Sequence, residues 1–242
     1  MNNHHPEPAL DVVDLVASYR PGWTIGPANL RVSRGEIIGI AGPNGSGKST
    51  FLRCIVGDGP RISGRVIFDG RDVTGMPVEA RMRLGMSYQP QHANIFPALT
   101  VQENLQIASR TTRRSLDSRS LDRLRVIAEP VANLPDRRAG LLSGGDQQSL
   151  ALAMAFAVRA TVYFVDEPFA GLSSGRVIQV QKMIVESVKA AAAAAVIVEH
   201  RVEYLEPICN RILYLSTLLH PAGPVPVQFE TSIESDARRL RD

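Results

Sequence analysis

The chain has 242 residues, of which 44% are hydrophobic and 21% are charged, and this balance excludes a disordered, collagen-like or disulfide-stapled protein. The net charge is only +3 and the basic residues are scattered, so no nucleic-acid partner is expected. The longest core-like apolar run, residues 149–158, is about half of the roughly 20 residues that a membrane-spanning helix needs, and no basic-then-apolar leader opens the chain, so we expect a cytoplasmic protein.

The first part of the chain contains short apolar segments at residues 10–17, 28–32 and 65–69. Glycine and proline residues bound these segments, which is typical of strands joined by tight turns. We therefore expect an antiparallel sheet that lies beside a larger, parallel core.

A phosphate-binding motif follows the predicted buried strand at residues 36–41. The motif is G-x-x-x-x-G-K-S, and a helical pattern begins directly after it, which is the context that the motif requires. Backbone N–H groups of the loop and the positive end of the helix dipole would bind phosphates, Lys48 would neutralise the terminal phosphates, and Ser49 would place its hydroxyl on Mg²⁺. The expected cradle comprises Gly42, Pro43, Asn44, Gly45, Ser46, Gly47, Lys48, Ser49 and Thr50.

A second buried strand is predicted at residues 162–165, and it ends in Asp166 and Glu167. Its continuous apolar run is typical of a parallel strand that is covered on both faces. Ligands of parallel sheets lie beyond the carboxyl ends of the strands, so both carboxylates are expected beside the nucleotide. Asp166 is suited to hold Mg²⁺ through its water shell, and Glu167 to deprotonate the water that attacks the terminal phosphorus.

Between the two strands lies Leu-Ser-Gly-Gly-Asp-Gln-Gln, residues 142–148, ahead of a strongly helical segment. With its flanking motifs, this segment resembles the signature sequence of ATP-binding cassette (ABC) ATPases, and the resemblance covers roughly residues 10–215. It implies ATP as the nucleotide and an α/β fold of the P-loop NTPase (RecA-like) type, with a parallel-sheet core, an antiparallel β subdomain and an inserted α-helical subdomain. Cassettes of the family pack head to tail, so Ser143, Gly144 and Gly145 would cap the terminal phosphate bound by a second copy or a paralogue.

The resemblance assigns three further residues. Gln91 matches the glutamine that touches Mg²⁺ and the attacking water, with Gln89 as the alternative. His200 matches the histidine that reaches the terminal phosphate. Tyr19 matches the aromatic residue that stacks on adenine against the antiparallel sheet, with Trp23 as its rival.

The chain departs from the family pattern at two places. Ser173 stands where many members have an aspartate that couples the two ATP sites, and the usual glycine-containing hairpin after residue 215 is expected to be missing. We expect one domain over residues 1–242, with the core and β subdomain at about 9–91 and 142–215, the helical subdomain at about 92–141, and a C-terminal tail at 216–242.

Three other features favour structural roles. Cys54 and Cys209 belong to no C-x-x-C motif, which indicates reduced, buried thiols. The arginine-rich run 110–125 also contains aspartates and is interpreted as a solvated helix face. The alanines at 190–195 are expected to end a helix before a strand that begins at 196.

The resemblance is strongest to the ATPases of branched-chain amino-acid-type importers, so we expect an ATPase that powers uptake of amino acids or similar small solutes. A groove beside Gln91 would receive a helix from a separate transmembrane permease, which would hold the chain on the inner face of the cell membrane. The alternative is a cytoplasmic ATPase of iron–sulfur cluster assembly. A DNA-repair or translation ATPase would need a coiled-coil insertion or a second cassette. The presence of Glu167 as a predicted base argues against a protein that binds nucleotide without hydrolysing it.

Overall fold

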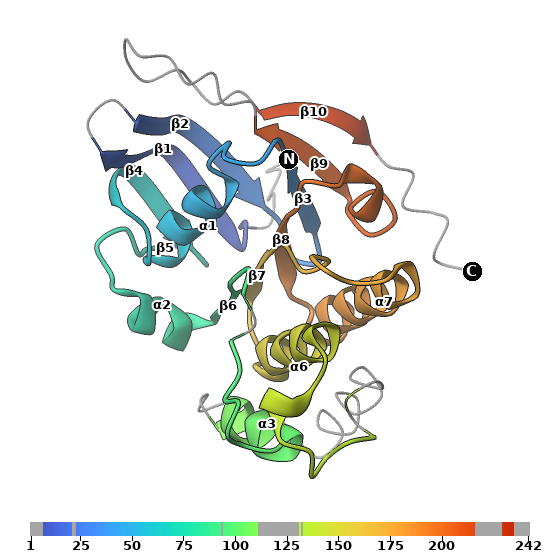
Figure 1. Cartoon of the computed structure of the whole chain (residues 1–242). Helices are drawn as coiled ribbons and strands as arrows, with labels where there is room; N and C mark the ends of the chain where they lie inside the picture. Colours follow the sequence, from blue (N-terminus) through green and yellow to red (C-terminus); the bar gives the residue numbers. More distant parts are fainter. Residues whose placement is uncertain are drawn as a thin grey trace, which may run out of the picture.

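The structure is a computed structural model and describes residues 7–20, 23–92, 94–110, 131, 133–215 and 229–234. Two sheets and the helices around them account for most of these residues (Figure 1). Ser173 and the loops that carry the sequence motifs lie within the described ranges, whereas most of the arginine-rich run 110–125 lies outside them.

The smaller sheet has the strand order β2-β1-β4-β5 and is antiparallel, as the sequence predicted. β1 spans Leu10–Arg20 and β2 spans Trp23–Val32, so both are longer than the apolar runs that indicated them. β4 (Arg61–Phe68) and the short β5 (Arg71–Asp72) complete the sheet. The polar ends of these strands form because the neighbouring strand pairs with their backbone, which the hydrophobic pattern does not record.

The larger sheet has the order β10-β9-β3-β8-β7-β6. β9 (Arg211–Leu215), β3 (Ile37–Ala41), β8 (Ala194–Val198), β7 (Val162–Asp166) and β6 (Met86–Gln89) are mutually parallel. Every residue of β3, β7 and β8 is buried. The continuous apolar runs predicted this burial because helices or a second sheet cover both faces of such strands.

Alternate residues of the central strands enter two different cores. Ile38 and Ile40 of β3 pack with Phe51 of α1 (Lys48–Val56), on the side of the antiparallel sheet. Ile37 packs instead with Ile184 of α7 (Ser174–Ala191), on the opposite face. Figure 1 shows the resulting layers, with α1 and the antiparallel sheet on one side of the parallel strands and α6 (Gly144–Ala157) and α7 on the other.

α3 (Val101–Arg110) lies against α6, and their shared cluster includes Val101 and Leu150 (Figure 1). The short 3₁₀ turn η1 (Ala139–Leu141) leads from this region into α6, and a second, η2 (Val202–Tyr204), follows β8. Within the described ranges, no helix is both long and apolar enough to cross a membrane.

Two expectations from the sequence are wrong. α7 ends at Ala191 and β8 begins at Ala194, so the last alanines of the run belong to the strand and not to the helix. A hairpin does follow residue 215, because β10 (Phe229–Glu234) pairs antiparallel with β9. Pairing with the exposed edge of β9 satisfies backbone groups of a segment that is too weakly apolar to stand out in the sequence.

One arginine is as buried as the apolar core. Arg81 of α2 (Val78–Leu84) is 1% exposed. Its guanidinium donates hydrogen bonds to backbone carbonyls of Thr74, Met76, Cys54 and Ile55, at 2.7, 3.0, 3.2 and 2.5 Å. Arg81 thus satisfies carbonyls at the carboxyl end of α1, the helix that follows the predicted phosphate loop.

Candidate functional site

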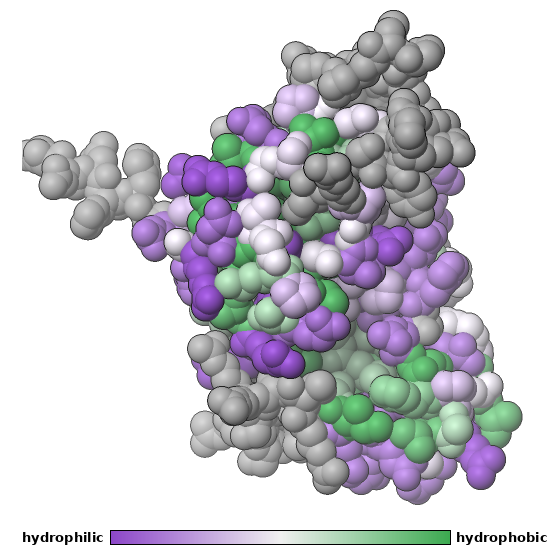
Figure 2. Space-filling model, turned by 90° about the vertical axis from the view of Figure 1, so that its left-hand side faces the viewer, coloured by the Kyte–Doolittle hydropathy of each residue, from purple (hydrophilic) through white to green (hydrophobic). Residues whose placement is uncertain are grey.

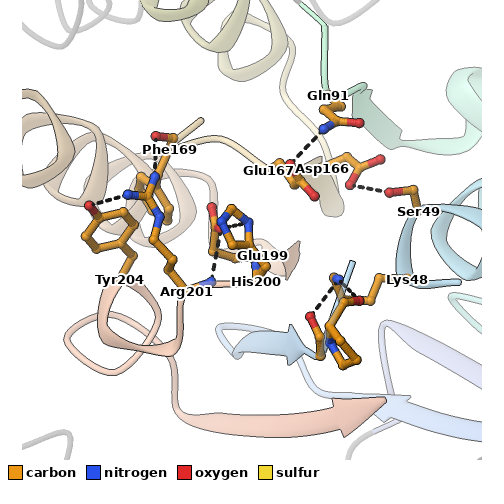
Figure 3. A network of polar contacts seen from close by, with 12 residues as sticks. Lys48, Ser49, Gln91, Asp166, Glu167, Phe169, Glu199, His200, Arg201 and Tyr204 are labelled. Carbon is orange, nitrogen blue, oxygen red and sulfur yellow. Dashed lines mark hydrogen bonds and ion pairs between the residues drawn. The ribbon is translucent and has the colours of Figure 1, made fainter. Parts of the chain in front are cut away.

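The candidate site lies at the carboxyl edge of three adjacent parallel strands. β3 and β7 both flank β8, and the three strands end at Ala41, Asp166 and Val198. The segments that follow these ends therefore meet, although they are far apart in the sequence (Figure 3). This is the edge at which ligands of parallel sheets bind.

The loop of residues 42–47 makes a tight turn from β3 into α1. Gly47 is the N-cap of α1 and has φ 96°, a left-handed conformation that favours glycine. Gly42 passes so close to the end of β9 that a Cβ atom would lie 2.6 Å from the Leu215 carbonyl oxygen. The glycines thus let the backbone curl around the start of a helix, where N–H groups are unpaired and anions are stabilised.

Lys48 is buried beneath this loop, and only 4% of it is exposed. Its Nζ donates hydrogen bonds to the carbonyl oxygens of Gly42 and Pro43, at 2.8 and 2.9 Å (Figure 3). Burial lowers the pKa of the Lys48 ammonium, and this effect outweighs the attraction of Glu167, Asp166 and Glu199. A cation held under a loop of backbone N–H groups is well suited to bind a phosphate chain.

Ser49 and Asp166 are brought together from α1 and β7. The Ser49 hydroxyl donates to Asp166 Oδ1 at 2.9 Å, and Asp166 is 2% exposed (Figure 3). Burial raises the pKa of Asp166 to about 6, with Glu167 and Glu199 adding to the rise and Ser49 and Lys48 opposing it. A hydroxyl lies beside a buried carboxylate whose negative charge is only partly balanced by nearby groups. This pair of oxygen donors fits Mg²⁺, which prefers hard oxygen ligands.

Glu167 follows Asp166 and turns out of the sheet. Its φ of 47° is unusual for a residue other than glycine, and its N–H donates to the Val198 carbonyl at 2.9 Å. Gln91 Nε2 donates to Glu167 Oε2 at 2.7 Å. Gln89 is buried in β6 and donates to the Pro90 carbonyl, so of the two glutamines it is Gln91 that meets Glu167 (Figure 3).

His200 lies on the other side of the loop, after β8. It lines a hollow of about 370 Å³ together with Gly42, Pro43, Asn44, Val202 and Tyr214. Its Nδ1 lies 2.8 Å from Oε1 of Glu199, a fully buried carboxylate. The structure thus places His200 beside the loop that was predicted to hold phosphates.

The signature residues lie elsewhere in the same chain. Ser143 is the N-cap of α6, and its hydroxyl oxygen accepts from the Asp146 N–H at 3.2 Å and donates to Asp146 Oδ2 at 2.5 Å. Arg176 of α7 pairs with the same carboxylate at 2.6 Å. Ser143 and Gly144 are exposed and Gly145 is partly exposed, and the start of α6 is well separated from α1 in Figure 1.

The remaining predicted site residues lie in loop 42–47, in α1 and in the first two strands. Ser46 is buried in the loop, Gly45 is exposed, and Thr50 lies half-buried in the first turn of α1. The side chains of Tyr19 and Trp23 lie outside the described residues, although their backbones belong to β1 and β2.

Sequence reasoning gave no role to Glu199, Arg201 or Arg176. A signal existed for Glu199 alone, because it follows an apolar strand in the same way as Asp166 does. Arg201 donates to the Tyr204 hydroxyl and to the Phe169 carbonyl at 2.8 and 3.4 Å, contacts that no local pattern indicates (Figure 3).

Comparison with protein families and curated proteins agrees with this site. A family model described as ABC transporter matches residues 25–170. The lipopolysaccharide export system ATP-binding protein LptB of Escherichia coli K12 is 32% identical over 209 residues, which cover 86% of each chain. LivF of Archaeoglobus fulgidus, described as a probable branched-chain amino acid transport ATP-binding protein, is 38% identical over 164 residues, or 68% of this chain and 70% of LivF.

Solved structures give the same result. The ATP-binding subunit of an ABC transporter superposes with a TM-score of 0.74 at 25% identity, over 85% of both chains. An ATP-binding cassette in its ADP conformation gives a TM-score of 0.72 at 25% identity, over 86% of this chain and 87% of its own. The comparisons named here provide no support for the iron–sulfur assembly alternative. The chain belongs to the ABC transporter family, as one of its ATP-binding, ATP-hydrolysing proteins.

Proposed function

We propose that the chain hydrolyses Mg²⁺-ATP between two cassettes packed head to tail, and that it thereby powers uptake of amino acids or similar small solutes through a separate membrane permease. The second cassette is another copy of this chain or a paralogue. In this arrangement the chain is peripheral to the inner face of the cell membrane.

The contact between Gln91 and Glu167 carries the catalytic part of the proposal. The distance of 2.7 Å from Gln91 Nε2 to Glu167 Oε2 brings an amide and a carboxylate side by side, close to the phosphate loop. Glu167 deprotonates the attacking water, and Gln91 holds that water in line. Lys48 and the loop N–H groups stabilise the charge that develops on the terminal phosphate.

Ser49, Asp166 and Gln91 are the residues that would hold Mg²⁺, through the hydroxyl, the carboxylate and the amide oxygen. When bound, the ion neutralises phosphate charge and orients the phosphate oxygens. Asp166 contributes its carboxyl group from a buried position, and the Ser49 hydroxyl orients that group by donating to Oδ1 at 2.9 Å.

The signature segment supports a head-to-tail pair. Ser143, Gly144 and Gly145 stand at the N-terminus of α6, where unpaired N–H groups and the helix dipole favour an anion. A Cβ atom on Gly144 would have no neighbour within 4 Å, so a ligand can approach its backbone. Because this segment is remote from loop 42–47 of its own chain, the phosphate that it caps belongs to the partner cassette.

An apolar surface near Gln91 suits the permease. The exposed side chains of Phe96, of Ile107 on α3 and of Leu141 on η1 belong to this end of the molecule. Figure 2 shows apolar side chains gathered on the lower part of one face, at the level of α3 in Figure 1. Apolar patches ringed by polar residues are typical of protein interfaces.

The substrate class follows the description of LivF, which names branched-chain amino acid transport, and the direction of uptake follows the resemblance of the sequence motifs to importer ATPases. LptB matches a longer part of the chain and belongs to an export system, so lipid export is the second candidate. Reconstitution of the chain with its permease in proteoliposomes separates the two. ATP-dependent accumulation of labelled amino acids supports the first, and ATP-dependent extraction of lipid from the bilayer supports the second.

The catalytic part is tested with Glu167→Gln, with Glu206→Gln as the control because Glu206 is exposed and lies on the segment after η2. We expect E167Q to lower kcat by about 10²- to 10⁴-fold, the usual contribution of a general base, and to accumulate an ATP-bound dimer in size-exclusion chromatography. Hydrolysis by E167Q at the parent rate would remove Glu167 from the role of base. Activity per molecule that does not rise with protein concentration would contradict the dimer.

A further inference from the structure

Glu199 is a buried carboxylate to which the proposed mechanism gives no role. None of its surface is exposed, and its Oε1 accepts hydrogen bonds from the backbone N–H groups of His200 and Arg201, at 2.8 and 3.2 Å. The same oxygen lies 2.8 Å from His200 Nδ1 (Figure 3). Its second oxygen, Oε2, is buried and has no hydrogen-bond partner among the described residues.

These contacts locate a proton on the His200 ring. Oε1 already accepts from two N–H groups, so it faces Nδ1 as an acceptor, and two acceptors 2.8 Å apart would repel each other. Nδ1 is therefore the protonated nitrogen. Nε2 remains as the ring nitrogen that is available to a ligand in the hollow beside Gly42, Pro43 and Asn44.

Two basic side chains near His200, those of Arg201 and Lys48, already donate hydrogen bonds to other groups of the protein. The side chain of Arg201 points away from the ring to the Tyr204 hydroxyl and the Phe169 carbonyl, and Lys48 is held by the carbonyls of loop 42–43. A phosphate in the hollow would therefore meet the Nε2 side of the ring, while Glu199 holds the Nδ1 side.

We propose that Glu199 is the positioning residue of His200: it fixes the ring with Nδ1–H toward the core, and this orientation presents Nε2 to an oxygen of the terminal phosphate. This inference rests on the proposed function. Glu199 itself does not touch the nucleotide and acts only through His200.

The kinetic test is a double-mutant cycle of Glu199→Gln and His200→Ala, with ATP hydrolysis as the readout. Glutamine has the size of glutamate and can still accept the backbone N–H groups, but it carries no charge. We expect E199Q to lower kcat by about 10- to 100-fold, the range that follows loss of the partner behind a metal-bound histidine, while KM for ATP changes less. In the H200A background, E199Q should have no further effect.

Glu203→Gln is the matched control, because Glu203 is exposed on η2 in the same segment and should leave kcat unchanged. Equal melting temperatures of E199Q and the parent would show that the fold is kept. If the effects of E199Q and H200A on kcat multiply, Glu199 does not act through His200 and the inference is overturned.

The spectroscopic test needs neither hydrolysis nor a dimer. In protein labelled with ¹⁵N-histidine, the signals of the His200 ring are assigned as those that disappear in the variant His200→Gln. In the free protein we expect a proton on Nδ1, which faces Glu199, and after addition of a non-hydrolysable ATP analogue with Mg²⁺ we expect the Nε2 signal to shift. In E199Q, we expect the analogue to leave the Nε2 signal unchanged.

A free protein with Nε2–H and bare Nδ1, or an E199Q ring that responds like the parent, would overturn the inference. A parent protein that shows the expected ring signals but does not hydrolyse ATP would instead contradict the proposed function and leave the pairing of Glu199 with His200 in place.

Discussion

Substitution of Arg81 by methionine tests how the helix of the phosphate loop is held. Arg81 is 1% exposed, and its guanidinium donates to four backbone carbonyls, two of them at the carboxyl end of α1. Methionine keeps much of the volume of the side chain but removes every donor. The perturbation is therefore loss of hydrogen bonds with little change in packing.

The magnitude follows from the burial of each acceptor. Loss of the bond to the buried Ile55 carbonyl costs about 1 to 3 kcal/mol, and loss of each bond to the half-buried carbonyls of Thr74 and Met76 costs about 0.5 to 1.5 kcal/mol. The Cys54 carbonyl keeps its bond from the Gly57 N–H at 3.2 Å and loses little. We expect R81M to lower the free energy of unfolding by about 2 to 6 kcal/mol.

Thermal unfolding followed by circular dichroism measures this loss, which corresponds to a melting temperature lower by roughly 10 °C in a chain of this size. Arg83→Met is the control, because Arg83 lies on the same helix and is exposed. Its effect should stay within about 0.5 kcal/mol. Equal melting temperatures of the two variants would refute the reasoning, because they would mean that the buried hydrogen bonds of Arg81 add nothing to stability.

Three further predictions concern single residues. Gly42→Ala should cost about 1 to 3 kcal/mol of stability and weaken binding of a fluorescent ATP analogue, because the added Cβ would lie 2.6 Å from the Leu215 carbonyl oxygen. Gly75→Ala is the control, since a Cβ there meets open space and should change neither property. Equal affinities of the two variants for the analogue would contradict the tight turn at Gly42. Burial raises the pKa of the Cys54 thiol to about 12. This thiol should therefore react with a disulfide reagent at pH 8 far more slowly in the folded protein than in urea. Equal reaction rates in the two conditions would count against its burial. Burial opposes ionisation of Asp146, but the hydrogen bonds from Ser143 and the hydrogen bond and ion pair with Arg176 of α7 together hold its pKa below the usual value. Asp146→Asn should therefore lower stability at pH 7, and its difference from the parent should shrink as the pH falls from about 4 through the lowered pKa of Asp146. A difference that does not change as the solution is acidified would exclude this account.

The sequence by itself predicted the parallel core and its phosphate loop. The strands β3 and β7 are continuous apolar runs, and the glycines of loop 42–47 stand directly between a strand and a helix. These signals are local, since burial on both faces and a left-handed turn each restrict the residues of one short segment. Asp166 and Glu167 were predicted for the same reason, because position after a parallel strand is enough to place a side chain at the ligand edge.

Longer-range contacts decided the remaining features. Gln89 and Gln91 have the same chemistry two residues apart, and only the end of β6 determines that Gln91 is the one that turns to Glu167. β10 has no strong strand pattern, and it joins the sheet because the edge of β9 offers unpaired backbone groups.

Charged residues in the interior show most clearly what only the tertiary structure decided. Arg81 and Glu199 have charges that sequence reasoning would normally assign to the surface. Each is nevertheless buried. Arg81 finds distant partners, the backbone carbonyls of α1, whereas the partners of Glu199 are the ring and backbone N–H groups of the residues that follow it. The burial of both charges is decided only when distant segments pack, α1 against Arg81 and the end of β3 against Glu199, whose N–H donates to the Ile40 carbonyl.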